Sequence, residues 1–196
     1  MPRALLSVYN KTGIEELARG LVASGWSIIS SGGTAKALVA AGISVTDVAD
    51  LTGVPAILDH RVVTLHPKVH GGILADTALP HHVADMAEYG IEAIDLVVVN
   101  LYPFSSNPSV DLIDVGGPAM IRAAAKNFAR VGVVVEPSQY TPVLAEISAN
   151  GALSLETRRQ LSARAFATTR NYDAAIEQWM SGNEKFALSL QLEHVS

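Results

Sequence analysis

The segment that decides the fold reads Asp-Leu-Val-Val-Val-Asn-Leu-Tyr and spans residues 95–102. Its centre, residues 96–99, is apolar at every position, so a strand formed there would be buried on both faces. Strands of this kind are typical of parallel sheets that helices cover on both sides. Similar short apolar runs lie at residues 4–9, 26–30 and 131–135, with a weaker one at 43–48. The five runs predict a parallel sheet.

Segments with apolar residues at helical spacing separate these strands. Residues 51–76 have no clear period and contain Pro55 and Pro67, so we interpret them as a long functional loop with short ordered pieces. The alternation of strands and helices predicts an α/β fold with helices on both faces of the sheet. The helices are expected at residues 14–24, 34–39 (with Thr34 as the N-cap), 80–89, 117–128, 138–149 and 154–180.

The composition indicates one globular domain. The chain has 196 residues, of which 49% are hydrophobic and 17% charged, and its mean hydropathy is +0.28. These values exclude a disordered protein or a coiled coil. A net charge of -5 disfavours binding to a nucleic-acid backbone. The absence of cysteine excludes disulfides, thiol catalysis and Cys-ligated metal sites.

The location and partners of the chain are expected from its apolar segments. The N-terminal apolar run is too short for a signal peptide, and the longest apolar stretches fall far below the ~20 residues of a membrane span. We therefore expect a cytoplasmic protein. A small domain with so few charges is expected to cover part of its apolar surface, either as a homodimer or against a further domain.

Two strand-to-helix junctions carry groups suited to a phosphate. Ligands of parallel sheets bind at the carboxyl ends of the strands, where helix N-termini present free N–H groups. Paired glycines in the second junction let the backbone approach an anion closely. Either loop alone could be a turn with an N-cap, but the pair favours a phosphate site. The polar groups are those of Ser7, Lys11 and Thr12 at the first junction and Ser31 and Thr34 at the second.

Residues 61–72 gather basic, hydroxyl and imidazole groups. His66 and His70 are four residues apart, a spacing that can bind zinc on a helix. Pro67 lies between them and permits at most a helix start, and no third ligand is close in the sequence. Histidines that form hydrogen bonds within a loop are the better interpretation.

Residues 113–127 combine a carboxylate with two cations. Arg122 and Lys126 stand one turn apart on a predicted helix that is otherwise alanine and apolar residues, and like charges at that spacing repel. They are either two surface cations or are neutralised by an anionic partner or by a carboxylate such as Asp114. A buried Lys–Asp pair would have shifted pKa values suited to proton transfer.

Seven motifs follow one another along the chain: SVYNKTG (7–13), SGGTAK (31–36), Arg61 with TLHP (64–67), HGGIL (70–74), VVNLYPF (98–104), DVGG (114–117) and RAAAKN (122–127). Over roughly residues 3–182 the sequence resembles the IMP cyclohydrolase domain of bifunctional purine biosynthesis enzymes. The resemblance implies a methylglyoxal-synthase-like fold, a Rossmann-like three-layer sandwich with a mainly parallel sheet. It also implies that residues 183–196 are a tail or linker toward a transformylase domain.

The resemblance further implies a reaction and a role for each matched residue. The reaction is the dehydrative ring closure of 5-formamidoimidazole-4-carboxamide ribotide to IMP, without cofactor or metal. Asp114 and Lys126 would form the proton-transfer pair, and Asn100 and Tyr102 would complete the catalytic set in contact with the base. The substrate-binding residues, most of them around the 5′-phosphate, would be Ser7, Lys11, Thr12, Ser31, Gly33, Thr34, Arg61, Thr64, Gly116 and Gly117.

Two departures from the family pattern keep other functions open. Val63 stands where the family usually has a lysine that is counted among its catalytic residues, and the stretch between Phe104 and Asp114 is shorter than usual. Val63 favours a non-catalytic nucleotide-binding module of the same fold, similar to the regulatory domain of carbamoyl-phosphate synthetase. A methylglyoxal synthase is the other alternative, which the motifs around Asp114 and Lys126 disfavour.

Overall fold

The structure is a computed structural model that describes residues 1–59 and 61–182, so the predicted tail or linker at 183–196 lies outside the described residues. A five-stranded sheet in the order β3-β2-β1-β4-β5 forms its centre, and all neighbouring strands run parallel. This confirms the predicted parallel sheet. The strands are β1 (Arg3–Val8), β2 (Ser27–Ser30), β3 (Thr46–Asp47), β4 (Leu96–Asn100) and β5 (Gly132–Val134).

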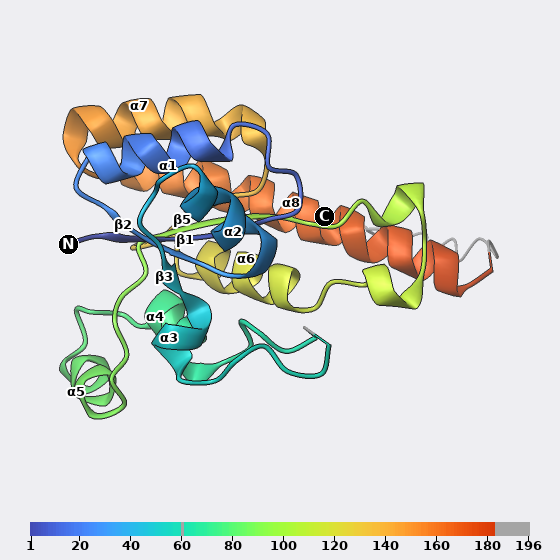
Figure 1. Cartoon of the computed structure of the whole chain (residues 1–196), viewed down its shortest axis with the longest axis horizontal. Coiled ribbons are helices and arrows are strands. Elements are labelled where there is room, and N and C mark those ends of the chain that lie inside the picture. Colours follow the sequence, from blue (N-terminus) through green and yellow to red (C-terminus); the bar gives the residue numbers. More distant parts are fainter. Residues whose placement is uncertain (60, 183–196) are drawn as a thin grey trace, which may run out of the picture.

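Helices cover both faces of the sheet, so the α/β class with three layers is also confirmed. Figure 1 shows α1 and α7 together on one side of the sheet and α6 and α4 on the other. Helix α8 packs along α6 and β5. The helices are α1 (Ile14–Ala23), α2 (Gly32–Ala40), α3 (Val48–Thr52), α4 (Pro67–Leu74), α5 (Pro80–Glu88), α6 (Gly116–Lys126), α7 (Tyr140–Asn150) and α8 (Leu155–Met180), with 3-10 turns η1 (Phe104–Ser106), η2 (Val110–Leu112) and η3 (Pro137–Gln139).

The central strands form the core, as their composition predicts. Leu5, Leu6, Leu96 and Val97 have no exposed surface at all. The burial on both faces follows from the apolar side chains that point to each side of β1 and β4. Within residues 1–59 and 61–182, no helix combines the length and apolarity needed to span a membrane.

Three local predictions need correction. Helix α2 begins at Gly32 with Ser31 at the N-cap position, so Thr34 lies inside its first turn, where its hydroxyl bonds to the backbone of Val8. The third strand pairs only at residues 46–47, since Val48 already opens α3. The segment 51–76 contains a full helix, α4. Its start is capped by His66, whose Nδ1 accepts a hydrogen bond from the backbone N–H of Lys68 at 3.1 Å.

The strand order places a crevice at one edge of the sheet. From β1 the chain moves to β2 on one side, whereas β4 pairs with β1 on the other. The loops that follow β1 and β4 therefore diverge, and in open parallel sheets ligands bind where the strand order reverses in this way. This edge carries most of the residues that the sequence analysis selected.

Candidate active site

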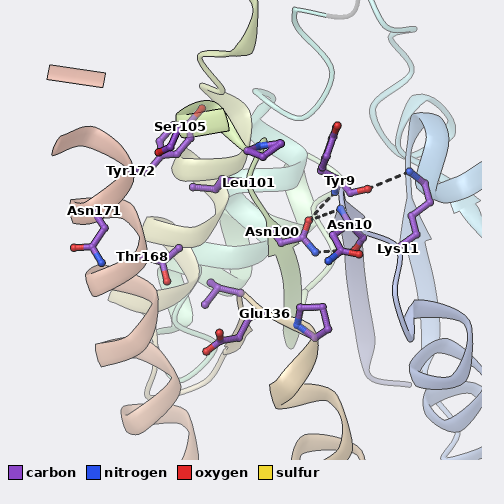
Figure 2. A pocket seen from close by; sticks show the side chains of 13 residues that line it. Tyr9, Asn10, Lys11, Asn100, Leu101, Ser105, Glu136, Thr168, Asn171 and Tyr172 are labelled. Carbon is purple, nitrogen blue, oxygen red and sulfur yellow. Dashed lines mark hydrogen bonds between the residues drawn. The ribbon is translucent and has the colours of Figure 1, made fainter. Parts of the chain in front are cut away.

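Asn100 ties the two loops of the crevice together. Its Oδ1 accepts hydrogen bonds from the backbone N–H groups of Tyr9 and Asn10 at 2.8 and 2.9 Å, and its Nδ2 donates to the carbonyl of Asn10 at 2.9 Å. Figure 2 shows these bonds crossing from β4 to the loop after β1. The Asn100 amide thus holds the loop that carries Lys11, while its predicted contact with a base stays a prediction.

Lys11 and the start of α2 form an anion-binding corner. A Cβ placed on Gly33 would lie 3.6 Å from Nζ of Lys11, so the ammonium stands beside the first turn of α2. The first N–H groups of a helix have no partner within it and carry partial positive charge. The Ser31 side chain makes no capping bond to them. An ammonium beside free helix N–H groups is suited to a phosphate.

The other predicted phosphate ligands differ in how exposed they are and in whether they already form hydrogen bonds within the protein. Thr34 is buried, and its hydroxyl both accepts from the N–H and donates to the carbonyl of Val8, each at 3.0 Å. It therefore links α2 to the end of β1. Ser7 is half-buried in β1, and Thr12 is exposed with its N–H donated to Oδ1 of Asn10. A Cβ added at Gly33 would make only an ordinary van der Waals contact with the Lys11 side chain.

A second cluster lies at the start of α6. Thr64 is buried, and its Oγ1 would be 2.9 Å from a Cβ added at Gly116, so the two residues touch although 52 positions separate them. Arg61 instead forms an exposed ion pair of 2.9 Å with Asp111 in η2. The structure therefore places Arg61 against the loop that leads to Asp114.

Asp114 is the carboxylate of this cluster. Its Oδ1 accepts a hydrogen bond of 2.9 Å from the N–H of Gly117. Burial raises the pKa of Asp114, and hydrogen bonds from the N–H groups of Gly117 and Gly116 oppose part of that shift. A Cβ on Gly117 would come within 2.2 Å of Oδ2, so only glycine fits there. A held carboxylate with a raised pKa is suited to accept a proton.

Lys126 lies away from this cluster. It is the last residue of α6, ten residues beyond Gly116 and so ~15 Å along the helix axis, and it is exposed. The structure thus does not bring Asp114 and Lys126 together as a proton-transfer pair within one chain. Arg122 lies over the ring of Phe166, 5.7 Å from its centroid, so an aromatic face and not Asp114 neighbours this cation.

An open cleft of about 1000 Å³ follows the crevice toward α8. Tyr102 is exposed beside it and meets Tyr9 edge-on, with ring centroids 5.2 Å apart. Figure 2 shows the loop after β1 on one wall and α8 on the other. The lining residues are Tyr9, Asn10, Lys11, Asn100, Leu101, Pro103, Ser105, Val135, Glu136, Pro137, Thr168, Asn171 and Tyr172.

The two histidines with zinc-like spacing, His66 and His70, lie in the part of the chain that the structure describes. There, no group of three or more His, Cys, Asp or Glu side chains could hold a metal ion. His66 is the N-cap of α4, and His70 lies inside that helix. Burial lowers the pKa of His70, and its Nε2 is buried without a hydrogen-bond partner.

Two tyrosines that sequence reasoning missed support the site. Tyr140, at the start of α7, packs its ring against Gly13, and its buried hydroxyl faces Asn100 without completing a hydrogen bond. Burial raises the pKa of Tyr140 to about 12. Tyr172 on α8 forms hydrogen bonds next to Asp114. Both sit in amphipathic helices outside the seven motifs, where the pattern indicates only core packing.

Two family models and several curated proteins match this chain. Residues 13–129 match the family model of the MGS-like domain, and residues 124–196 match that of the AICARFT/IMPCHase bienzyme. The chain is 51% identical over 98% of its length to the bifunctional purine biosynthesis protein PurH of Mesorhizobium japonicum, and 53% identical over 91% to that of Brucella canis. It covers 36% and 35% of these relatives, about a third of their length.

A solved structure shares the whole fold. The crystal structure of ForH superposes with a TM-score of 0.83 at 40% sequence identity, covering 91% of this chain and 98% of ForH. The match to the MGS-like family model runs from the start of α1 to just past the end of α6, and it therefore includes the start of α2, Asn100 and Asp114. The chain therefore belongs to the MGS-like domain family.

Proposed function

We propose that the chain is an IMP cyclohydrolase, which closes the ring of 5-formamidoimidazole-4-carboxamide ribotide with loss of water. The observation that carries the proposal is the half-buried carboxylate of Asp114 just before α6, held by the N–H of Gly117 at the same sheet edge as the anion-binding corner of Lys11 and α2. The purine biosynthesis named for the PurH relatives supports it.

The proposed reaction uses these groups in order. The 5′-phosphate binds Lys11 and the first N–H groups of α2, which fixes the ribotide at the edge of the sheet. The carboxamide nitrogen attacks the formyl carbon, and Asp114 takes the proton that this nitrogen must lose. The Thr64 hydroxyl, which lies against Gly116 close to Asp114, is the proposed donor for the developing oxyanion. The formamido nitrogen gives up a second hydrogen, and the formyl oxygen leaves as water.

Positioning supplies much of the expected acceleration, since both reacting groups belong to one molecule. This matters because Val63 occupies the place of the family lysine. The Val63 side chain packs against the hydrophobic core, so it offers neither charge nor a hydrogen bond to the site. That observation favours the non-catalytic nucleotide-binding module as the second candidate.

One assay separates the candidates. The chain is incubated with the formylated ribotide, and the absorbance of IMP is followed. Turnover is expected. Binding of IMP measured by calorimetry, without any turnover, would support the binding module, and release of methylglyoxal from dihydroxyacetone phosphate would support the synthase.

The phosphate corner predicts a binding defect. Lys11→Ala is expected to weaken IMP binding by ~10-fold or more in calorimetry, because a charge-assisted hydrogen bond to the phosphate is lost. Lys36→Ala removes the same charge from an exposed position further along α2 and serves as the control. Equal affinity of wild type and Lys11→Ala would contradict the assignment.

We also propose the partners that the reaction needs. A formyl-transferring domain or subunit must supply the substrate, and the match of residues 124–196 to the AICARFT/IMPCHase bienzyme supports such a neighbour. A homodimer would cover exposed apolar side chains such as Val110 and Val115. Sedimentation of the purified chain would report the oligomeric state.

A further inference from the structure

The hydroxyl of Tyr172 forms two hydrogen bonds to the backbone next to Asp114. The Oη of Tyr172 accepts a hydrogen bond of 2.8 Å from the N–H of Asp114 and donates one of 2.8 Å to the carbonyl of Leu112. Both partners lie about 60 residues earlier in the chain, at 58 and 60 positions. The short loop between η2 and α6 is thus tied to α8 on either side of Ile113.

The packing of α8 sets the place of Tyr172. Leu161, Ala165, Thr169 and Tyr172 follow at intervals of four, four and three, and they form the buried stripe of this helix. The Ser162 hydroxyl donates to the carbonyl of Ala125 at 2.7 Å, which fixes α8 against α6. Because α6 begins at Gly116, two residues after Asp114, the packing of α8 on α6 also constrains the loop that carries Asp114.

The ring of Tyr172 is held independently of its hydroxyl. It is 8% exposed and meets the buried ring of Phe104 edge-on, with centroids 6.1 Å apart. A phenylalanine would keep this packing. It would leave the N–H of Asp114 and the carbonyl of Leu112 without their partner, and unpaired backbone groups in a half-buried loop favour rearrangement.

We propose that Tyr172 is a positioning residue for the Asp114 carboxylate. The N–H of Gly117 orients the side chain of Asp114, whereas Tyr172 fixes the backbone from which that side chain departs. The match to the MGS-like domain ends at residue 129, before α8 begins. A helix outside the matched segment therefore stabilises the proposed base.

The first test, which rests on the proposed cyclohydrolase activity, is Tyr172→Phe. A displacement of ~1 Å at a reacting group costs ~10²-fold in rate, so kcat is expected to fall by ~10- to 100-fold. KM is expected to stay within about threefold, since the phosphate corner is untouched. Tyr89→Phe, at an exposed position after α5, is the control and should match wild type. A kcat of Tyr172→Phe within about threefold of wild type would overturn the proposal.

A double variant tests whether Tyr172 acts through Asp114. If it does, Tyr172→Phe added to Asp114→Asn costs no further activity, because the group being positioned is already gone. If the activity lost in the double variant equals the product of the losses in the two single variants, the hydroxyl acts elsewhere and the positioning role is overturned.

Amide hydrogen exchange gives a readout that needs no turnover. In the folded wild-type chain the Asp114 amide should exchange slowly, and in Tyr172→Phe it should exchange at least ~10-fold faster. If Tyr172→Phe does not fold, the exchange rate of the Asp114 amide in wild type still tests the proposal. An unprotected Asp114 amide in wild type would overturn the proposal. A protected Asp114 amide in a chain without turnover would support the two hydrogen bonds of Tyr172 but would contradict the proposed cyclohydrolase activity.

Discussion

Replacing Asp114 with asparagine is expected to lower kcat for ring closure by ~10²–10⁴-fold, the usual effect of removing a general base. Asparagine keeps the size of the side chain and an oxygen for the N–H of Gly117, so IMP affinity should change little. Kinetics with the formylated ribotide and calorimetry with IMP measure the two quantities. Asp85→Asn on the exposed helix α5 is the control. A variant within about threefold of wild type would move the proton chemistry to another group.

The same variant should gain stability at neutral pH. Because burial raises the pKa of Asp114 in the folded state, the folded chain binds this proton more tightly than the unfolded chain does. The contribution is fully present below the unfolded pKa and is lost as the pH rises through the folded pKa. At pH 7 the Tm of Asp114→Asn should therefore exceed that of wild type, and the difference should vanish below pH ~4. Such a gain would show that lost activity does not come from unfolding.

The second large effect is expected at Arg130, at the opposite edge of the sheet. Its guanidinium donates to the carbonyls of Gly72, Ile73, Ala75 and Ile94 and to Oδ1 of Asp95, at 2.6–3.1 Å. Together with the N–H of Ile94 and the amide of Asn127, these bonds satisfy the last carbonyls of α4, which have no partner within the helix. Burial lowers the pKa of Arg130, and the neighbouring carboxylate of Asp95 opposes this. One side chain thus joins α4, β4 and the turn after α6.

Arg130→Met is expected to destabilise the fold by about 3 kcal/mol, since it leaves the half-buried carboxylate of Asp95 without its cation and removes one donor from each of the four carbonyls. Urea denaturation followed by circular dichroism measures the loss. Arg164→Met is the matched control, because Arg164 pairs with Glu136 on the surface, and its urea midpoint should not move measurably. An Arg130→Met midpoint equal to that of wild type would show that the carbonyls find water or other donors at no cost.

Most of the site was visible in short segments of sequence. Lys11 and Gly33 stand in motifs directly after strands, and strand ends gather at one edge of a parallel sheet. The residue types were informative about chemistry because only glycine permits the close approach seen at Gly117. Whether each polar side chain is free to bind a ligand was not predictable from the sequence. Thr34 reads as a free hydroxyl in its motif, yet the backbone of Val8 occupies it.

The sequence by itself determined the parallel sheet, the burial of residues 96–99 and the position of the crevice, but it did not predict α3 and α4. These follow from local spacing of apolar residues and from the geometry of parallel sheets. Only the tertiary structure decided which polar groups meet. It separated Lys126 from Asp114 by the length of α6 and brought Tyr172 to Asp114 from 58 residues away. Such contacts depend on how helices pack against one another. The spacing of apolar residues in one helix shows which face is buried, but it does not show which element covers that face.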